Sequence, residues 1–302
     1  MYKNLIYKTW AYSREYLFRK KIRKIATAVK PGGLPELLRK NYEKLWLWTG
    51  RVQSHLYPSV YGYISGVASS LYVPENVYYL HIEPVLNNRA YSLSYADKNF
   101  YENYLTGFRN FFPVTVLRCI NGSYYDQQYK PADIDNDISA LLSEGKDFIV
   151  KPAVETGGGL KVNSFRKIGG KIILDGKQVT LKDFIIYLKK EYSGSFVVQE
   201  KIHQHNWFGI FNESSLNTVR MLCYRSVTNN GIHVLHSVVR FGREGSVVDN
   251  QAAGGLSCGI RPDGKLNDFC IDKSGNRYTG QPFLVKAAGQ QVPGYEKMKD
   301  LA

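Results

Sequence analysis

A lysine followed closely by three glycines is the part of the sequence best suited to chemistry. Residues 147–159 read D-F-I-V-K-P-A-V-E-T-G-G-G, so a short apolar run delivers Lys151 and leads to Gly157, Gly158 and Gly159. The lysine supplies a positive charge, and glycines let backbone amides approach oxygen atoms that side chains would otherwise block. This combination favours binding of a polyphosphate. The spacing is neither that of a P-loop nor G-x-G-x-x-G, and a hairpin with a glycine turn accounts for it about as well.

The composition of the chain also points to an anionic ligand. Its 302 residues carry a formal net charge of +14, while the hydrophobic content of 44% and the charged content of 22% are ordinary for a globular protein. That length allows one large domain or two smaller ones. The positive charge implies attraction to a nucleotide, an acidic glycan or an anionic membrane face. Nucleic acid is not expected as a partner, because the sequence contains none of the motifs that bind it.

Nothing in the sequence indicates secretion or membrane insertion. No segment reaches the roughly 18 uncharged apolar residues that a spanning helix requires. Lysine and arginine interrupt each apolar run near the N-terminus, so no signal peptide is expected. The cysteines have no C-x-x-C and no paired metal spacing, which indicates reduced thiols. We therefore expect a cytoplasmic protein.

Residues 2–30 are basic and aromatic, and part of this stretch has the pattern of an amphipathic helix. Ile22, Ile25, Ala26 and Val29 keep helical spacing among many lysines and arginines. One interpretation is contact with an anionic lipid surface, at the inner face of the membrane, or with an acidic partner. The other is a solvated basic helix packed on the protein. A second helix is predicted between residues 34 and 46, and residues 1–50 together form a helical N-terminal extension.

The remaining elements follow from hydrophobic periodicity and turn residues. Asp133 suits the N-cap of one helix, and Thr180 with Asp183 resembles a capping box at the start of another. Helices are predicted over residues 97–104, 133–145 and 181–192 and from residue 295. Strands are predicted over residues 77–81, 112–120, 124–125, 148–150, 171–174, 178–180, 195–200, 217–227 and 232–241.

Five short motifs follow one another along the chain. They are D-K at 97–98, F-I-V-K-P with G-G-G at 148–159, V-V-Q-E-K-I at 197–202, S-L-N-T-V-R at 215–220, and V-V-R-F-G with V-D-N-Q-A-A-G-G at 238–255. In this order they resemble the ATP-grasp superfamily, and most closely its sugar-transfer-associated family, found among cell-surface polysaccharide biosynthesis proteins. The resemblance implies an α+β ATP-grasp fold in which two α+β subdomains clamp ATP. Residues 51–96 would precede that fold, residues 97–200 would form its lid subdomain and residues 201–302 its C-terminal subdomain.

The resemblance also implies how ATP is held. Lys98 and Lys151 would contact the α- and β-phosphates, each as a point charge. The loop at Gly157–Gly159 would close over the phosphates and exclude water. The ribose would be held by Gln204 or His205, although a carboxylate often has that role. Backbone groups that pair with the adenine edge would come from Glu200, Lys201 and Ile202.

Two arginines and an asparagine are the candidate catalytic residues. By resemblance, Arg220 and Arg240 would contact the γ-phosphate and the acyl phosphate, because guanidinium groups match phosphate oxygens bidentately. Asn250 and the pair Gly254-Gly255 would form the loop near the acceptor. Taken without the family, each arginine is more simply a charge on a strand surface.

The resemblance breaks at the metal site. ATP-grasp enzymes bind one or two Mg²⁺ ions through a late aspartate and a Glu-x-Asn motif on a final pair of strands, and the sequence up to Ala302 has no such motif. The metal ligands are therefore not identified, and Asp263, Asp268 and Asp272 read as turn residues. We expect a truncated chain whose C-terminal subdomain is incomplete. The alternative is a nucleotide-binding remnant that does not hold Mg²⁺ normally.

Three functions remain compatible with these residues. The first is an ATP-dependent carboxylate–amine ligase that acts through an acyl phosphate, with a glycan or glycan precursor as substrate and an amino acid as the second reactant. The second is an ATP-dependent sugar kinase on the same fold. The third is a nucleotide-binding but catalytically incomplete module that docks through its basic N-terminus.

Overall fold

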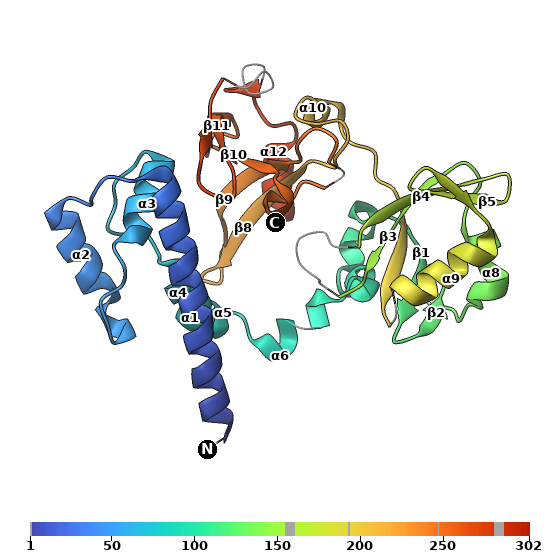
Figure 1. Cartoon of the computed structure of the whole chain (residues 1–302), viewed down its shortest axis with the longest axis horizontal. Coiled ribbons are helices and arrows are strands. Elements are labelled where there is room, and N and C mark those ends of the chain that lie inside the picture. The colour runs from blue at the N-terminus through green and yellow to red at the C-terminus, as the bar shows by residue number, and fades with distance from the viewer. Residues whose placement is uncertain (1, 93, 155–160, 193, 247, 281–286) are drawn as a thin grey trace. The chain divides into compact units, whose positions relative to one another are not determined.

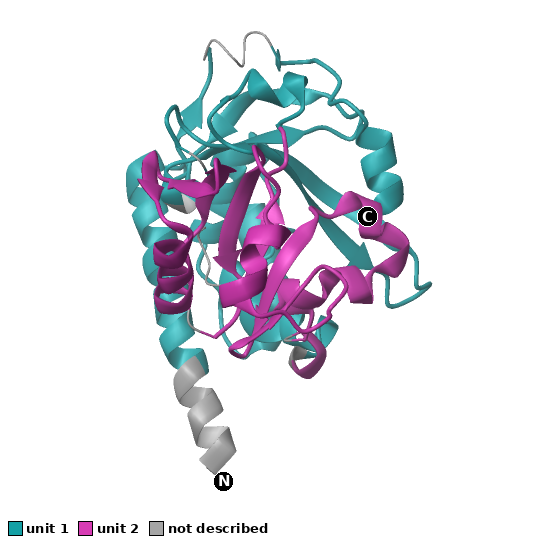
Figure 2. Ribbon diagram, turned by 90° about the vertical axis from the view of Figure 1, so that its right-hand side faces the viewer, with its two compact units in different colours: residues 1–88, 204–302 teal, residues 89–203 magenta. Residues whose placement is uncertain are grey.

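The computed structural model describes residues 2–92, 94–154, 161–192, 194–246, 248–280 and 287–302. They form two compact units: unit 1 consists of Met1–Asn88 and Gln204–Ala302, and unit 2 of Arg89–His203 (Figure 2). Residues 97–200, the expected lid, lie within unit 2. Residues 1–50, the expected N-terminal extension, and residues 204–302 of the expected C-terminal subdomain belong to one unit, because the chain returns to unit 1 at Gln204.

Unit 1 begins with helices that pack through a small apolar core. The 28-residue helix α1 contacts α3 through the buried side chains of Ile22, Val29, Tyr57 and Val60. A Cβ atom at Gly275 would lie 3.0 Å from Cγ2 of Ile25 and 3.3 Å from Val29, so a late turn of the unit lies against α1. The helical segments are α1 (Tyr2–Val29), α2 (Glu36–Trp46), η1 (Leu47–Thr49), α3 (Leu56–Ser65), α4 (Glu75–Val77), η2 (Tyr78–Ile82) and α5 (Glu83–Leu86).

The strand predicted around residues 77–81 is wrong. That stretch is helical: α4 continues into the π-helical turn η2 and then into α5. Val77 and Leu80, three residues apart, are both buried, which is the spacing of one helix face and not of a strand. The tyrosines and branched residues between them raise β propensity locally, but packing decides the outcome.

The second part of unit 1 is a five-stranded antiparallel sheet in the order β12-β11-β10-β9-β8. Phe208 and Phe211 from the region of α10, and Val292 and Tyr295 near α12, complete its buried core. The hydroxyl groups of Tyr295 and Ser237 lie 3.1 Å apart, which fixes α12 on β9. The elements are α10 (Asn206–Gly209), β8 (Thr218–Arg225), β9 (Ile232–Phe241), η6 (Gln251–Ala253), β10 (Leu256–Ile260), β11 (Leu266–Ile271), β12 (Arg277–Tyr278) and α12 (Tyr295–Leu301).

Unit 2 is a seven-stranded antiparallel sheet in the order β2-β1-β7-β3-β4-β5-β6. Helices α8 and α9 cover one face and bury Ile138, Phe184 and Leu188 against Phe148 and the strands (Figure 1). The N-caps are as expected: Asp133 accepts from the amide of Asp135, and Thr180 from the amide of Asp183. The elements are β1 (Thr115–Ile120), β2 (Ser123–Tyr125), α8 (Ile134–Leu141), β3 (Asp147–Pro152), β4 (Asn163–Ile168), β5 (Lys171–Leu174), β6 (Lys177–Val179), α9 (Leu181–Glu191) and β7 (Phe196–Glu200).

Short helical turns precede the sheet of unit 2. They are α6 (Arg89–Ser92), η3 (Ser94–Ala96), η4 (Lys98–Phe100), α7 (Tyr101–Tyr104) and η5 (Thr106–Phe111). Of these, η4 contacts β1 and β7. Helices with antiparallel sheets in both units confirm the predicted α+β class. Over the described ranges, none of the helices has the length and apolar character needed to cross a membrane.

Candidate functional site

Strand β3 presents Lys151 on the face of the sheet away from α8 and α9. Phe148 and Val150 point into the core and are fully buried, so alternation along the strand puts Lys151 on the other face. There it pairs in register with Val197 of β7. No hydrogen bond or ion pair within the described residues engages its ammonium group. The ammonium group is therefore available to bind an anionic ligand.

Lys98 is held beside the end of the same strand. Its backbone amide and its Nζ both donate to the carbonyl oxygen of Ala153, each at 3.0 Å. Burial, and to a lesser extent the nearby charge of Lys98, together lower the pKa of Lys151 to about 8. Two ammonium groups kept close in a partly desolvated place repel each other. Binding a polyphosphate there would offset both the desolvation of Lys151 and its repulsion by Lys98.

A buried polar frame holds the turn that carries Lys98. The guanidinium of Arg118, with no exposed surface, donates to the carbonyl oxygen of Asn99 at 2.8 Å and to Oε2 of Glu102 at 2.5 Å. It also lies 4.3 Å from the ring centroid of Tyr129, whose hydroxyl donates to the same Asn99 carbonyl. The Asn99 side chain donates to the carbonyl oxygen of Cys119 at 3.1 Å. Lys98 is therefore positioned by a core network, not by a free loop.

This frame is not predicted by any sequence motif. Its one signal was an arginine within an otherwise apolar strand, since a fully buried arginine is rare unless it is paired. The glycine loop lies outside the described residues, so the roles predicted for Gly157, Gly158 and Gly159 stay predictions.

Two backbone amides at the end of β7 already donate hydrogen bonds to neighbouring residues of unit 2. The amide of Glu200 donates to Val114 O, and the amide of Lys201 donates to Asp147 O, both at 2.9 Å. The Glu200 carboxylate pairs with Lys146 at 2.5 Å. These two amides are therefore not free for an adenine. Among the described residues no hydrogen bond involves the amide of Ile202, which leaves that donor for the predicted role.

The residues predicted for the ribose begin the return to unit 1. Nδ1 of His205 accepts from the amide of Trp207 at 3.2 Å and caps α10, while Oε1 of Gln204 accepts from the amide of Asn217 at 2.5 Å. Both residues line a hollow with a volume of about 970 Å³. Glu213 and Glu244 line the same hollow, so it contains carboxylates that the sequence does not place near Gln204 and His205. No motif in the sequence had indicated them.

The candidate catalytic arginines lie on one face of the sheet of unit 1. Thr218 pairs with Arg240 across β8 and β9, and Arg220 pairs with Val238. Residues two apart on a strand share a face, so Arg220 and Arg240 are diagonal neighbours. Burial lowers the pKa of Arg240; the charge of Asp249 opposes this effect, and the charge of Arg220 reinforces it.

The side chain of Asn250, predicted to lie in the loop near the acceptor, contacts Arg240. Nη2 of Arg240 donates to Oδ1 of Asn250 and lies 3.4 Å from Oδ1 of Asp249. The hydroxyl of Thr218 donates to the other oxygen of Asp249. Arg220 is exposed, whereas the Arg240 side chain retains 19% of its exposure. No role was predicted for Asp249, although it stands directly before Asn250 in the sequence.

Two glycines, Gly254 and Gly255, allow the tight turn that holds Asp249 and Asn250 next to Arg240. A Cβ atom at Gly255 would lie 2.6, 2.8 and 2.9 Å from the carbonyl oxygens of Asp249, Phe241 and Asn250. Gly254 has a φ of +96°, in the left-handed region that favours glycine. The pair therefore lets the chain turn tightly from Asn250 into β10.

The described residues do not supply a recognisable Mg²⁺ site. Across the described ranges there is no group of three or more His, Cys, Asp or Glu side chains that could hold a metal ion. Asp249, the carboxylate at the arginines, already pairs with Arg240 and Thr218. We derive no step through a metal ion from these residues.

The family model described as sugar-transfer associated ATP-grasp matches residues 80–302, more than half of the chain. The chain belongs to the sugar-transfer-associated ATP-grasp family. This membership confirms the predicted ATP-grasp fold and supports an ATP-dependent, ligase-like role in sugar-related transfer. Comparison with curated proteins and with solved structures found no match. Residues 1–79, which include α1, lie outside the family match.

Proposed function

We propose that this ATP-grasp protein is a carboxylate–amine ligase that uses ATP in cell-surface polysaccharide biosynthesis or decoration. The observation that supports it most is Lys151, a half-buried ammonium without a partner among the described residues and next to Lys98. A partly desolvated cation pair stabilises a polyphosphate more strongly than it stabilises water or a neutral ligand. Membership in the family supports ATP as that polyphosphate.

In the first step, a carboxylate oxygen of the substrate attacks the γ-phosphorus of ATP. The bond between that phosphorus and the β,γ-bridging oxygen breaks, and ADP leaves with the bond's electron pair. Lys98 and Lys151 would offset the negative charge on the α- and β-phosphates. Arg220 and Arg240 would contact the transferred phosphoryl group, where guanidinium groups stabilise the charge that develops on its oxygens.

In the second step, an amine attacks the acyl carbon of the acyl phosphate. The bond from that carbon to the phosphate oxygen breaks, inorganic phosphate leaves, and the amine proton passes to solvent. The pairing of Arg240 with Asn250 and Asp249 supports a role for Arg240 in holding the acyl phosphate, because its guanidinium is already oriented. The net charge of +14 supports an acidic glycan or precursor as the carboxylate.

The reaction is tested by following an isotope from the carboxylate. The full chain is incubated with MgATP, a glucuronic acid-containing oligosaccharide labelled with ¹⁸O in its carboxylate, and an amino acid. A ligase transfers one ¹⁸O to inorganic phosphate, and ADP release requires both the acid and the amine. Product formation without ATP would contradict the proposal.

Two other outcomes identify the rival functions. A phosphosugar detected by ³¹P NMR, with no free phosphate, would replace the ligase with a sugar kinase. ATP binding without turnover for any acid and amine pair would favour the docking module. Both outcomes leave the family assignment intact, because it rests on the match over residues 80–302.

A further inference from the structure

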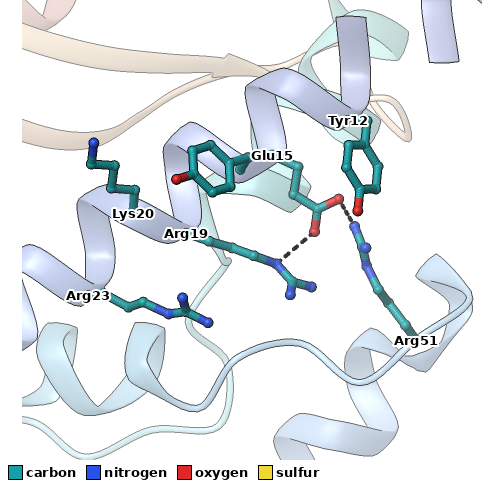
Figure 3. Close-up of a pocket in the computed structure, with 7 residues that line it drawn as sticks. Tyr12, Glu15, Arg19, Lys20, Arg23 and Arg51 are labelled. Atoms are coloured by element: carbon teal, nitrogen blue, oxygen red, sulfur yellow. Dashed lines mark hydrogen bonds and ion pairs between the residues drawn. The ribbon is translucent and has the colours of Figure 1, made fainter. Parts of the chain in front are cut away.

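A pocket with a volume of about 310 Å³ lies on α1, outside the residues matched by the family. Figure 3 shows that its walls come from successive turns of α1 and from Arg51, which follows η1. The lining residues are Tyr12, Glu15, Tyr16, Arg19, Lys20, Arg23 and Arg51. Four of the seven are cationic, so the pocket differs in chemistry from an ordinary surface hollow.

A buried carboxylate fixes the geometry of two of the arginines. The side chain of Glu15 retains 9% of its exposure. Its Oε1 accepts from Nε of Arg19 at 3.1 Å, and its other oxygen pairs with Nη2 of Arg51 (Figure 3). Each guanidinium has five N–H donors, so pairing with one carboxylate oxygen leaves further donors for a ligand. Glu15 therefore orients these arginines without satisfying them.

The other two cations add charge that the pocket does not balance. Lys20 and Arg23 are exposed, and neither side-chain head group has a hydrogen bond or ion pair with any residue that the structure describes. Four positive side chains thus surround one carboxylate, an excess of three charges. Such an excess attracts an anion of more than one negative charge.

We propose that this pocket binds the phosphate group of a small phosphate ester, such as a monosaccharide phosphate. Guanidinium groups match phosphate oxygens bidentately, and Lys20 adds a point charge. The rings of Tyr12 and Tyr16 are 77% and 63% exposed, and they offer apolar faces to the body of the ester. A volume of about 310 Å³ is at the small end for ligand sites, which suits a single sugar phosphate better than a larger nucleotide.

A phosphate ester could reach this pocket as a soluble molecule or as the head group of a phospholipid. The first is tested by calorimetric titration of the full chain with glucose 1-phosphate at physiological salt, with glucose as the neutral control. The second is tested by co-sedimentation with vesicles of phosphatidylglycerol in phosphatidylcholine, against phosphatidylcholine alone. Binding in either assay identifies the source.

Matched variants locate the binding. Lys20→Gln and Arg23→Gln each remove a cation from the pocket, and we expect each to weaken binding about tenfold. Lys24→Gln makes the same change one turn further along α1, outside the lining residues, and should weaken it less than threefold. All three positions are exposed, so thermal unfolding should not change.

Three results decide the proposal. Binding that Lys20→Gln and Arg23→Gln weaken but Lys24→Gln does not supports the pocket, for whichever source binds. Equal weakening by all three variants would show only general attraction to a basic helix and would overturn it, as would no binding in either assay. Lys151→Gln should retain glucose 1-phosphate binding, which separates this pocket from the proposed ATP site.

Discussion

Arg240 donates a hydrogen bond to the side chain of Asn250, across the turn that joins β9 to β10. The carboxylate of Asp249 lies 3.4 Å from the same nitrogen and is itself held by Thr218 of the neighbouring strand. The guanidinium is thus fixed from two sides by adjacent residues of one loop. A group oriented in this way loses little conformational entropy when it meets a phosphate.

The first prediction concerns the shape of that guanidinium. Arg240→Lys keeps the charge but removes the fork that contacts Asn250, so we expect ADP release to fall roughly 10²–10³-fold. ATP affinity should change less than threefold, because the lysine pair is untouched. The control is Arg225→Lys at the exposed end of β8. A variant with unchanged turnover would remove Arg240 from the mechanism.

The second prediction separates function from stability at Lys151. Lys151→Met should weaken ATP binding at least about tenfold, because a charge-assisted contact to phosphate is lost. The same change should raise the free energy of unfolding by roughly 2–3 kcal/mol at pH 7, because a pKa lowered to about 8 means that burial disfavours the charged form. Lys171→Met, at the exposed start of β5, should alter neither quantity. Calorimetry and thermal unfolding measure the two effects.

The third prediction is a pH dependence from the same group. Below pH 8 Lys151 is charged in the folded and unfolded chains, and its penalty is fully present. As pH rises from about 8 towards the ordinary lysine value of 10.5, the folded chain loses the proton first, so this group's contribution to stability becomes more favourable. ATP raises the pKa again, so binding at pH 8.5 should take up protons. Titrations in two buffers of different ionisation enthalpy measure the uptake, which Lys151→Met should abolish.

The fourth prediction concerns the tight approach at Gly255. Gly255→Ala places a methyl group against three carbonyl oxygens, the nearest at 2.6 Å, so the loop must move. We expect a loss of roughly 1–3 kcal/mol in unfolding free energy and a displaced Asn250. Gly209→Ala in the same unit meets no atom within 4 Å and should be nearly neutral. Equal stability of the two variants would contradict this account of the turn.

Local patterns predicted much of the secondary structure. The helix over 181–192 and its capping box agree with α9, where the Asp183 amide bonds to Thr180 at 3.1 Å. Such features depend on residues a few positions apart, so they can be read from sequence. Residues 77–81 show the limit, because two buried side chains three residues apart outweighed β propensity there.

The candidate site could be predicted less completely. Motif order pointed to Arg240 and Asn250, and the structure brings them together. The network around Arg118 could not be predicted, because it joins residues from η4, α7, β1 and the loop before α8. Glu213 and Glu244 likewise meet at one hollow only through folding. Contacts between residues far apart in the sequence follow no fixed spacing, so they cannot be predicted from local patterns.

The division of the chain has a consequence for its synthesis. The residues of unit 2 are contiguous, so a ribosome completes that unit once it has translated His203. Unit 1 combines residues that precede unit 2 in the chain with residues that follow it, and α1 lies against the turn at Gly275. Its first 88 residues must therefore remain without their late partners while all of unit 2 emerges. During that interval α3 can already cover Ile22 and Val29, whereas Ile25 still lacks its contact with the Gly275 turn. This side of α1 is therefore the apolar surface of unit 1 that stays open to aggregation until the late residues arrive.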